Sequence, residues 1–184
     1  MFAGARHKIL FAVLLLVSVA AAQELKNQPA VWANKPDIAA FEKMENDHLT
    51  AAQASIAQLL AVKGARTIDN TLAPYDEATR QLNTAIYFST LMQQVNPDAS
   101  YRDHATAMTT KVSSAQSALS LNRGVYDALS SLDMSQADPA TRYYVKRQLL
   151  EFRLAGVDKD EATRKKLNQL NRSEEHTSEL SHRR

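Results

Sequence analysis

Hydrophobic residues recur every three or four positions over most of the chain after residue 36, and this spacing is typical of helices with one buried face. The most regular run extends from Tyr101 to Leu129, where the spacing alternates between four and three as in a heptad repeat. It comprises Tyr101, Ala105, Met108, Val112, Ala115, Leu119, Asn122, Tyr126 and Leu129. The run predicts a single helix about 45 Å long at about 1.5 Å per residue. The polar Asn122 and the nearby Gly124 weaken it locally and are expected to mark a bend.

Two helices are predicted before this run, over residues 36–63 and 74–95, with a loop between them. Gly64 follows the first helix, where a C-cap is expected, and Pro74 opens the second. Their predicted faces are Ile38, Phe41, Glu45, His48, Ala52, Ser55 and Leu59 in the first helix and Tyr75, Ala78, Leu82, Ala85, Ser89 and Met92 in the second.

Two helices are also predicted after the run. The fourth begins at the pair Asp138-Pro139, a preferred N-cap followed by a preferred first helical residue, and ends at Gly156. The fifth begins near Asp158. Its apolar face consists of Ala162, Leu167 and Leu170.

Together these elements predict an all-α fold with about five helices in series, forming an antiparallel bundle over residues 36–171. The chain has only 4 Gly and 5 Pro, fewer turn residues than a β-sandwich needs. Its 184 residues correspond to one domain or to a piece of a larger one.

Net charge and cysteine content exclude several classes of partner and site. The formal charge is +2, and it comes from the first 22 residues, so residues 23–171 are neutral overall. Because no basic stripe is present to neutralise phosphates, no nucleic-acid partner is expected. The absence of Cys excludes disulfides and thiolate metal sites.

Residues 1–22 have the layout of a secretory signal peptide, with a short basic segment, an apolar run and small residues up to Ala22. Cleavage after Ala22 would place the mature protein in the periplasm or outside the cell, with no membrane contact. The alternative is an uncleaved membrane anchor, although the run is shorter than a bilayer requires. Residues 23–35 are expected to form an extended leader, in which Trp32 either anchors the leader to the core or stacks on a ligand.

Few residues suggest chemistry. His48 lies on the first predicted apolar face and is interpreted as a hydrogen-bonded core or interface histidine, because no second metal ligand lies at helical spacing. Asp103 and His104 are adjacent, so their side chains diverge on a helix. The tail offers three further groups that could bind a metal, Glu175, His176 and Glu179. No residue is predicted to be catalytic, cofactor-binding or metal-binding.

The final stretch, residues 172–184, differs in character from the helices before it. Its first part, "RSEEHTSEL", fits the codons AGA TCG GAA GAG CAC ACG TCT GAA CTC, the start of a widely used sequencing-library adapter. We therefore expect residues 172–184 to be translated adapter and the native sequence to continue differently after Asn171.

Three stretches carry a family resemblance. They are "RTIDNTLAPYDEA" (66–78), "NPDASYRDHATAMTTKVSSAQSALSLNRGVYDAL" (96–129) and "TRYYVKRQLLEFRLAGVDKDEATRKKLNQLN" (141–171). In this order and spacing, they resemble the N-terminal part of the thimet oligopeptidase/oligopeptidase A-like family of zinc metallopeptidases, also called peptidyl-dipeptidase-like.

The resemblance implies a mostly helical, channel-shaped fold that admits oligopeptides, with this chain forming part of the channel wall. The family holds zinc with the two His of an HExxH motif and a later Glu, and the Glu of the motif activates water. No position in this chain matches that motif. The resemblance therefore implies that zinc belongs to a full-length parent enzyme, and that this chain binds none and is inactive by itself.

A second hypothesis is a complete extracytoplasmic helical-bundle module that binds a partner protein. The heptad-like run favours it, because such runs often associate with other helices. The sequence leaves the substrate preference and the oligomeric state open.

Overall fold

The computed structural model describes the backbone of residues 37–181 and the side chains of residues 37–171. The predicted signal peptide, the leader with Trp32 and the side chains of the tail lie outside this part. The chain divides into two compact units, Met1–Phe41 and Glu42–Arg184. In the described part of the first unit, residues 37–41, the Asp37 carboxylate accepts the N–H of Ala40 at 2.7 Å and so caps the start of the first described helix.

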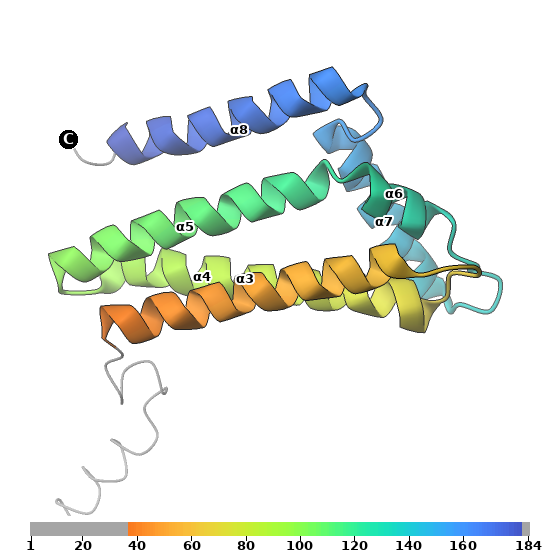
Figure 1. The fold of residues 1–184 in the computed structure, drawn as a ribbon, viewed down its shortest axis with the longest axis horizontal. Coiled ribbons are helices and arrows are strands. Elements are labelled where there is room, and N and C mark those ends of the chain that lie inside the picture. The colour runs from red at the N-terminus through yellow and green to blue at the C-terminus, as the bar shows by residue number, and fades with distance from the viewer. Residues whose placement is uncertain (1–36, 182–184) are drawn as a thin grey trace, which may run out of the picture. The chain divides into compact units, whose positions relative to one another are not determined.

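The described residues are all-helical and contain no strand, which confirms the predicted fold class (Figure 1). The elements are α3 (Ile38–Ala61), the π-helical turn η1 (Ile68–Leu72), α4 (Ala73–Val95), α5 (Ala99–Ser120), α6 (Arg123–Ser130), α7 (Pro139–Ala155) and α8 (Glu161–Ser181). No helix in this part of the chain has an apolar stretch long enough to span a bilayer.

The α4 helix buries the face that the sequence predicts, but helical structure begins earlier than expected. Thr67 and Asn70 form a reciprocal capping box, which starts η1 at Ile68 inside the predicted loop. In this π-helical turn, the N–H of Ala73 donates to the carbonyl of Ile68, five residues earlier in the chain. Pro74, which has no N–H to donate, is therefore accommodated inside a continuous helical segment rather than at its start. At the end of α3, Gly64 has φ +88° but lies three residues beyond Ala61, so it shapes the loop rather than the cap.

The prediction of one long helix from Tyr101 to Leu129 is wrong. The chain leaves the helix after Ser120, and the Asn122 side chain accepts the N–H of Val125, which caps a new helix, α6. Asn122 and Gly124 thus mark a break rather than a bend. The break resets the helical phase, and the residues that α6 buries are Val125, Ala128 and Leu129.

The last two helices begin where the sequence predicts. The Asp138 carboxylate accepts the N–H groups of Ala140 and Thr141, and Gly156 ends α7 with a left-handed φ of +99°. The backbone of α8 stays helical across Arg172, the first residue of the expected adapter-derived tail, since Glu and Leu in the tail favour helix. Of the predicted α8 face, Leu167 is half-buried, and Ala162 and Leu170 are exposed.

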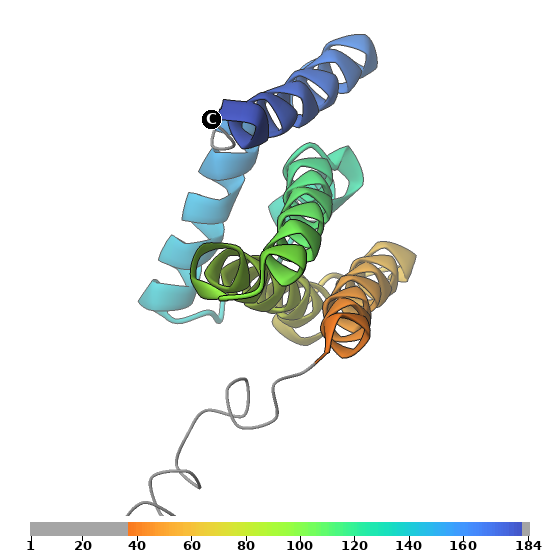
Figure 2. The same ribbon diagram turned by 90° about the vertical axis from the view of Figure 1, so that its left-hand side faces the viewer.

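Within the second unit, α3 from Glu42 onward lies beside α4 and α5, and α7 crosses α4 near its start (Figures 1 and 2). A turn of three residues between α4 and α5 makes these two helices antiparallel neighbours. The buried faces of these two helices combine small or unbranched side chains, among them Ala78, Ala85 and Ala105, with larger ones such as Leu82 and Val112. The small side chains let neighbouring helix backbones approach closely.

A pair of glycine substitutions tests the turn that sets the direction of α8. A Cβ at Gly156 would lie 2.6 Å from Leu167 Cδ1, whereas a Cβ at Gly64 would meet nothing within 4 Å. Both residues have positive φ, so Gly64→Ala and Gly156→Ala each lose about 1–2 kcal/mol from backbone strain. Gly156→Ala is expected to lose about 0.5–1.5 kcal/mol more, because the methyl group forces the end of the half-buried Leu167 side chain to shift. Urea denaturation of both variants measures the difference, and equal losses would contradict the described contact between Gly156 and Leu167.

Candidate functional site

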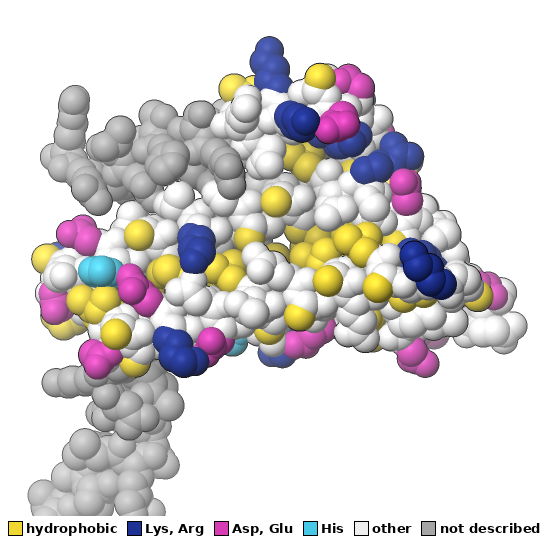
Figure 3. Space-filling model, in the orientation of Figure 1, with side chains coloured by type: hydrophobic (Ala, Val, Ile, Leu, Met, Phe, Trp, Pro, Cys, Tyr) yellow, Lys and Arg dark blue, Asp and Glu magenta, His cyan; other side chains and the backbone are white. Residues whose placement is uncertain are grey.

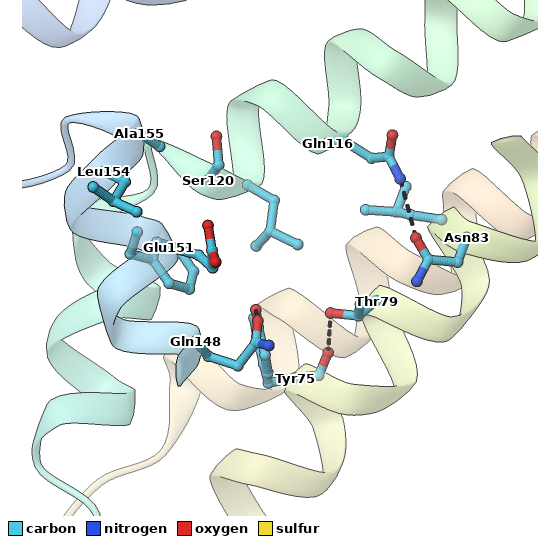
Figure 4. A pocket seen from close by; sticks show the side chains of 12 residues that line it. Tyr75, Thr79, Asn83, Gln116, Ser120, Gln148, Glu151, Leu154 and Ala155 are labelled. Carbon is cyan, nitrogen blue, oxygen red and sulfur yellow. Dashed lines mark hydrogen bonds between the residues drawn. The ribbon is translucent and has the colours of Figure 1, made fainter. Parts of the chain in front are cut away.

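A groove with a volume of about 440 Å³ lies between α4, α5 and α7 of the second unit (Figure 4). Its apolar walls come from Tyr75, Leu82, Leu119, Phe152, Leu154 and Ala155. Its polar groups come from Thr79, Asn83, Gln116, Ser120, Gln148 and Glu151. This mixture suits an apolar side chain together with polar peptide groups.

The α7 wall of the groove is held by aromatic packing and by one buried polar contact. The Phe152 ring is buried, and its centroid lies 5.9 Å from that of Tyr75 and 6.2 Å from that of Tyr126. The Tyr75 hydroxyl donates to Gln148 Oε1 at 2.8 Å. These contacts join α7 to α4 and α6, and they fix the width of the groove.

Several polar groups of the groove are bonded to one another. The Gln116 amide donates to Asn83 Oδ1 at 3.2 Å, and the Thr79 hydroxyl donates to the Tyr75 carbonyl at 3.0 Å (Figure 4). The Glu151 carboxylate pairs with Arg147 at 2.5 Å. None of these contacts forms the nucleophile–base pair that covalent catalysis requires.

The groove continues past Gln148 into a second hollow of about 480 Å³ beside α4, which Arg80 and Tyr87 also line. Here the Tyr144 hydroxyl donates to Asp76 Oδ1 at 3.0 Å. Partial burial, together with this bond and the Asp76 charge, raises the pKa of Tyr144. Tyr144 thus stays protonated and serves as a hydrogen-bond donor that ties α7 to α4.

On the other side of α4, the second unit buries a carboxyl group. Glu45 of α3 and Ser89 of α4 are both 0% exposed. Neither Glu45 oxygen has a hydrogen-bond partner, and the Ser89 hydroxyl does not complete a bond to it. Burial raises the pKa of Glu45 to about 7, against the weaker opposing effects of nearby Ser89 and the His48 charge.

The two described histidines have separate partners. His48 is half-buried at the contact between α3 and α4, where its Nδ1 lies 2.5 Å from Gln81 Oε1, so the interpretation as a hydrogen-bonded interface histidine is confirmed. The Nδ1 of His104 lies 2.5 Å from Glu42 Oε1. This pair was not predicted, because the two residues are 62 positions apart. Glu45 lies on a predicted apolar face, and an acidic residue at such a position was the available sequence signal for a buried carboxyl group.

The donor set of the described side chains does not fit a zinc ion. Zinc needs three or four His, Cys, Asp or Glu ligands that converge. Within residues 37–171 no three such side chains form a group that could hold a metal. His48 and His104 have different partners, Gln81 and Glu42, and do not converge on one site.

Comparisons with models of known families and with curated proteins give no match. The structure alone therefore shows the helical fold.

Truncating Phe152 is expected to release α7 from the groove. Phe152→Ala should lower the free energy of unfolding by about 3–5 kcal/mol, because it leaves a cavity between Tyr75 and Tyr126. Tyr143→Ala is the matched control on the same helix, since Tyr143 is 70% exposed, and it should change stability by less than about 0.5 kcal/mol. Thermal and urea denaturation measure both, and a small effect of Phe152→Ala would argue against the described packing of α7.

Proposed function

We propose that this chain is the N-terminal, channel-wall portion of a secreted zinc-dependent oligopeptidase. The parent enzyme would hydrolyse peptide bonds of oligopeptides with a zinc-activated water, and this chain alone would be inactive and bind no zinc. The proposal starts from the three sequence stretches that resemble the thimet oligopeptidase-like family. They coincide with η1 and the start of α4, with α5 and α6, and with α7 and α8.

The observation that carries the proposal is the exposure of apolar side chains on α7 and α8, and hydrophobic side chains at the surface of α8 are visible at the top of Figure 3. Leu154 is 71% exposed at the rim of the groove, Leu170 is 50% exposed, and Leu150 is also exposed. A helix that belongs to the wall of a larger helical enzyme would cover such side chains with further helices. The groove is then a place where more of the parent chain packs.

The second candidate, a complete helical binding module, rested on the heptad-like run. In the structure, the first half of that run is used inside the chain: Tyr101, Ala105, Met108, Val112 and Leu119 of α5 are buried. The run is therefore not free to associate with a partner helix. The exposed leucines remain compatible with a binding module, so the two candidates must be separated by experiment.

The first test is an assay of peptide hydrolysis. The purified chain, mixed with zinc and an internally quenched oligopeptide, should give no turnover above that of zinc alone, because its described side chains provide no metal site. The matching positive experiment uses the source DNA. Sequencing downstream of codon 171 should reveal a frame that continues to an HExxH motif, and the longer product should be active. A frame that truly encodes "RSEEHTSELSHRR" and then stops would remove the peptidase proposal.

The second test is the state of association in solution. The chain should self-associate through its exposed leucines, and the double variant Leu154→Ser, Leu170→Ser should shift it toward monomer, because both apolar side chains are removed from the same pair of helices. Tyr87→Ser removes an equally exposed apolar ring from α4 and is the control. Light scattering after size-exclusion chromatography measures the mass, and a monodisperse wild-type monomer would favour the binding module.

A further inference from the structure

The buried Glu45 has an environment that favours a neutral carboxyl group. Its side chain is 0% exposed in the contact between α3 and α4, and both oxygens lack hydrogen-bond partners. An ionised carboxylate without partners is costly to bury, whereas a protonated one loses far less. A protonated Glu45 could also donate a hydrogen bond to the buried hydroxyl of Ser89.

No cation on the neighbouring helices offsets a charge on Glu45. Residues 81–95 of α4 contain no Lys, Arg, His, Asp or Glu, and their one titratable side chain, Tyr87, is exposed. On α5, His104 pairs with Glu42, and Lys111 donates to the side chain of Asn46.

The remaining charged groups near this contact have partners or lie at the surface. On α5, Arg102 donates to the carbonyls of Asn96 and Pro97, Asp103 is exposed, and Tyr101 is buried. On α3 itself, Lys43 pairs with Asp47. His48 is the one group near Glu45 whose positive charge favours ionisation, and its effect is smaller than that of burial.

We propose that Glu45 acts as a pH-sensitive latch, by which we mean a contact between α3 and α4 that depends on protonation. The two helices pack tightly while the Glu45 carboxyl is protonated, and this packing weakens when the carboxyl ionises. The latch needs no ligand, and it goes beyond the proposed peptidase role. It would make the contact between α3 and α4 weaken as the surrounding pH rises through neutrality. A protein outside the cytoplasm meets such changes of pH directly.

The direction of the effect follows from proton binding. The pKa of Glu45 is raised in the folded chain, to about 7 from 4.5, so the folded state binds more protons than the unfolded state between these values. The contribution of protonated Glu45 to the free energy of unfolding is fully present below about pH 4.5 and is lost as the pH rises to about 7. One such proton changes the folding equilibrium by about tenfold for each pH unit in that window.

The test compares wild type with Glu45→Gln, which imitates the protonated carboxyl in size and neutrality. Urea denaturation of the full chain from pH 5 to pH 8, at two protein concentrations, should give a wild-type folding constant that falls by up to about tenfold per pH unit below pH 7. Glu45→Gln should fold and should lose most of this dependence. Asp47→Asn is the matched control on the same helix, since it removes the exposed partner of Lys43 but leaves Glu45 and both histidine contacts, and it should keep the wild-type dependence.

Two further measurements make the result specific to the latch. The ¹³C signal of the Glu45 carboxyl should titrate near neutral pH, and amide hydrogen exchange in α3, corrected for its intrinsic pH dependence, should rise more than in α7. Titration of Glu45 near its ordinary pKa, or an equal pH dependence in Glu45→Gln and wild type, would overturn the latch. Neither outcome bears on the peptidase proposal, because no peptide or zinc is present.

Discussion

The close approach of helices around α4 is the constraint on which the rest of the second unit depends. Its buried face combines Ala78, Ala85 and Ser89, all without exposed surface, with larger residues between them. Small side chains let neighbouring backbones come near enough for continuous packing, which is the main source of stability in a helical unit. They also leave little space for water. The same close packing therefore stabilises the contact with α5 and removes solvent from Glu45 on the α3 side.

The opposite side of α4 is more open. There α7 crosses near the start of α4, and the aromatic residues Tyr75 and Phe152 hold it in place. The groove lies beside this contact, between α4, α5 and α7. Two amide side chains along it accept hydrogen bonds, Gln148 from the Tyr75 hydroxyl and Asn83 from Gln116, which satisfies part-buried polar groups. A groove with this lining can receive a further helical segment, as the proposed role in a channel wall requires.

Much of the fold could be predicted because the decisive residues act locally. The α4 face was predicted residue by residue, and Asp138 and Gly156 begin and end α7 through contacts with residues a few positions away. The errors also have local causes. Asn122 was treated as a flaw in a continuous helix, yet its side chain caps a new one. The Thr67–Asn70 capping box was overlooked because Pro74 is a stronger start signal by pattern alone.

The sequence by itself determined the all-α class, most helix boundaries and the buried face of α4, since these depend on periodicity and on caps within one turn. The tertiary structure alone decided the partners of Tyr75 and His104, whose hydrogen bonds span 73 and 62 positions. It also decided the chemistry of Glu45. A glutamate on a helical pattern can face solvent, a cation or a core, and its pKa depends on which of these surrounds it. Only the packing of α3 on α4 places it away from water, and no local pattern contains that information.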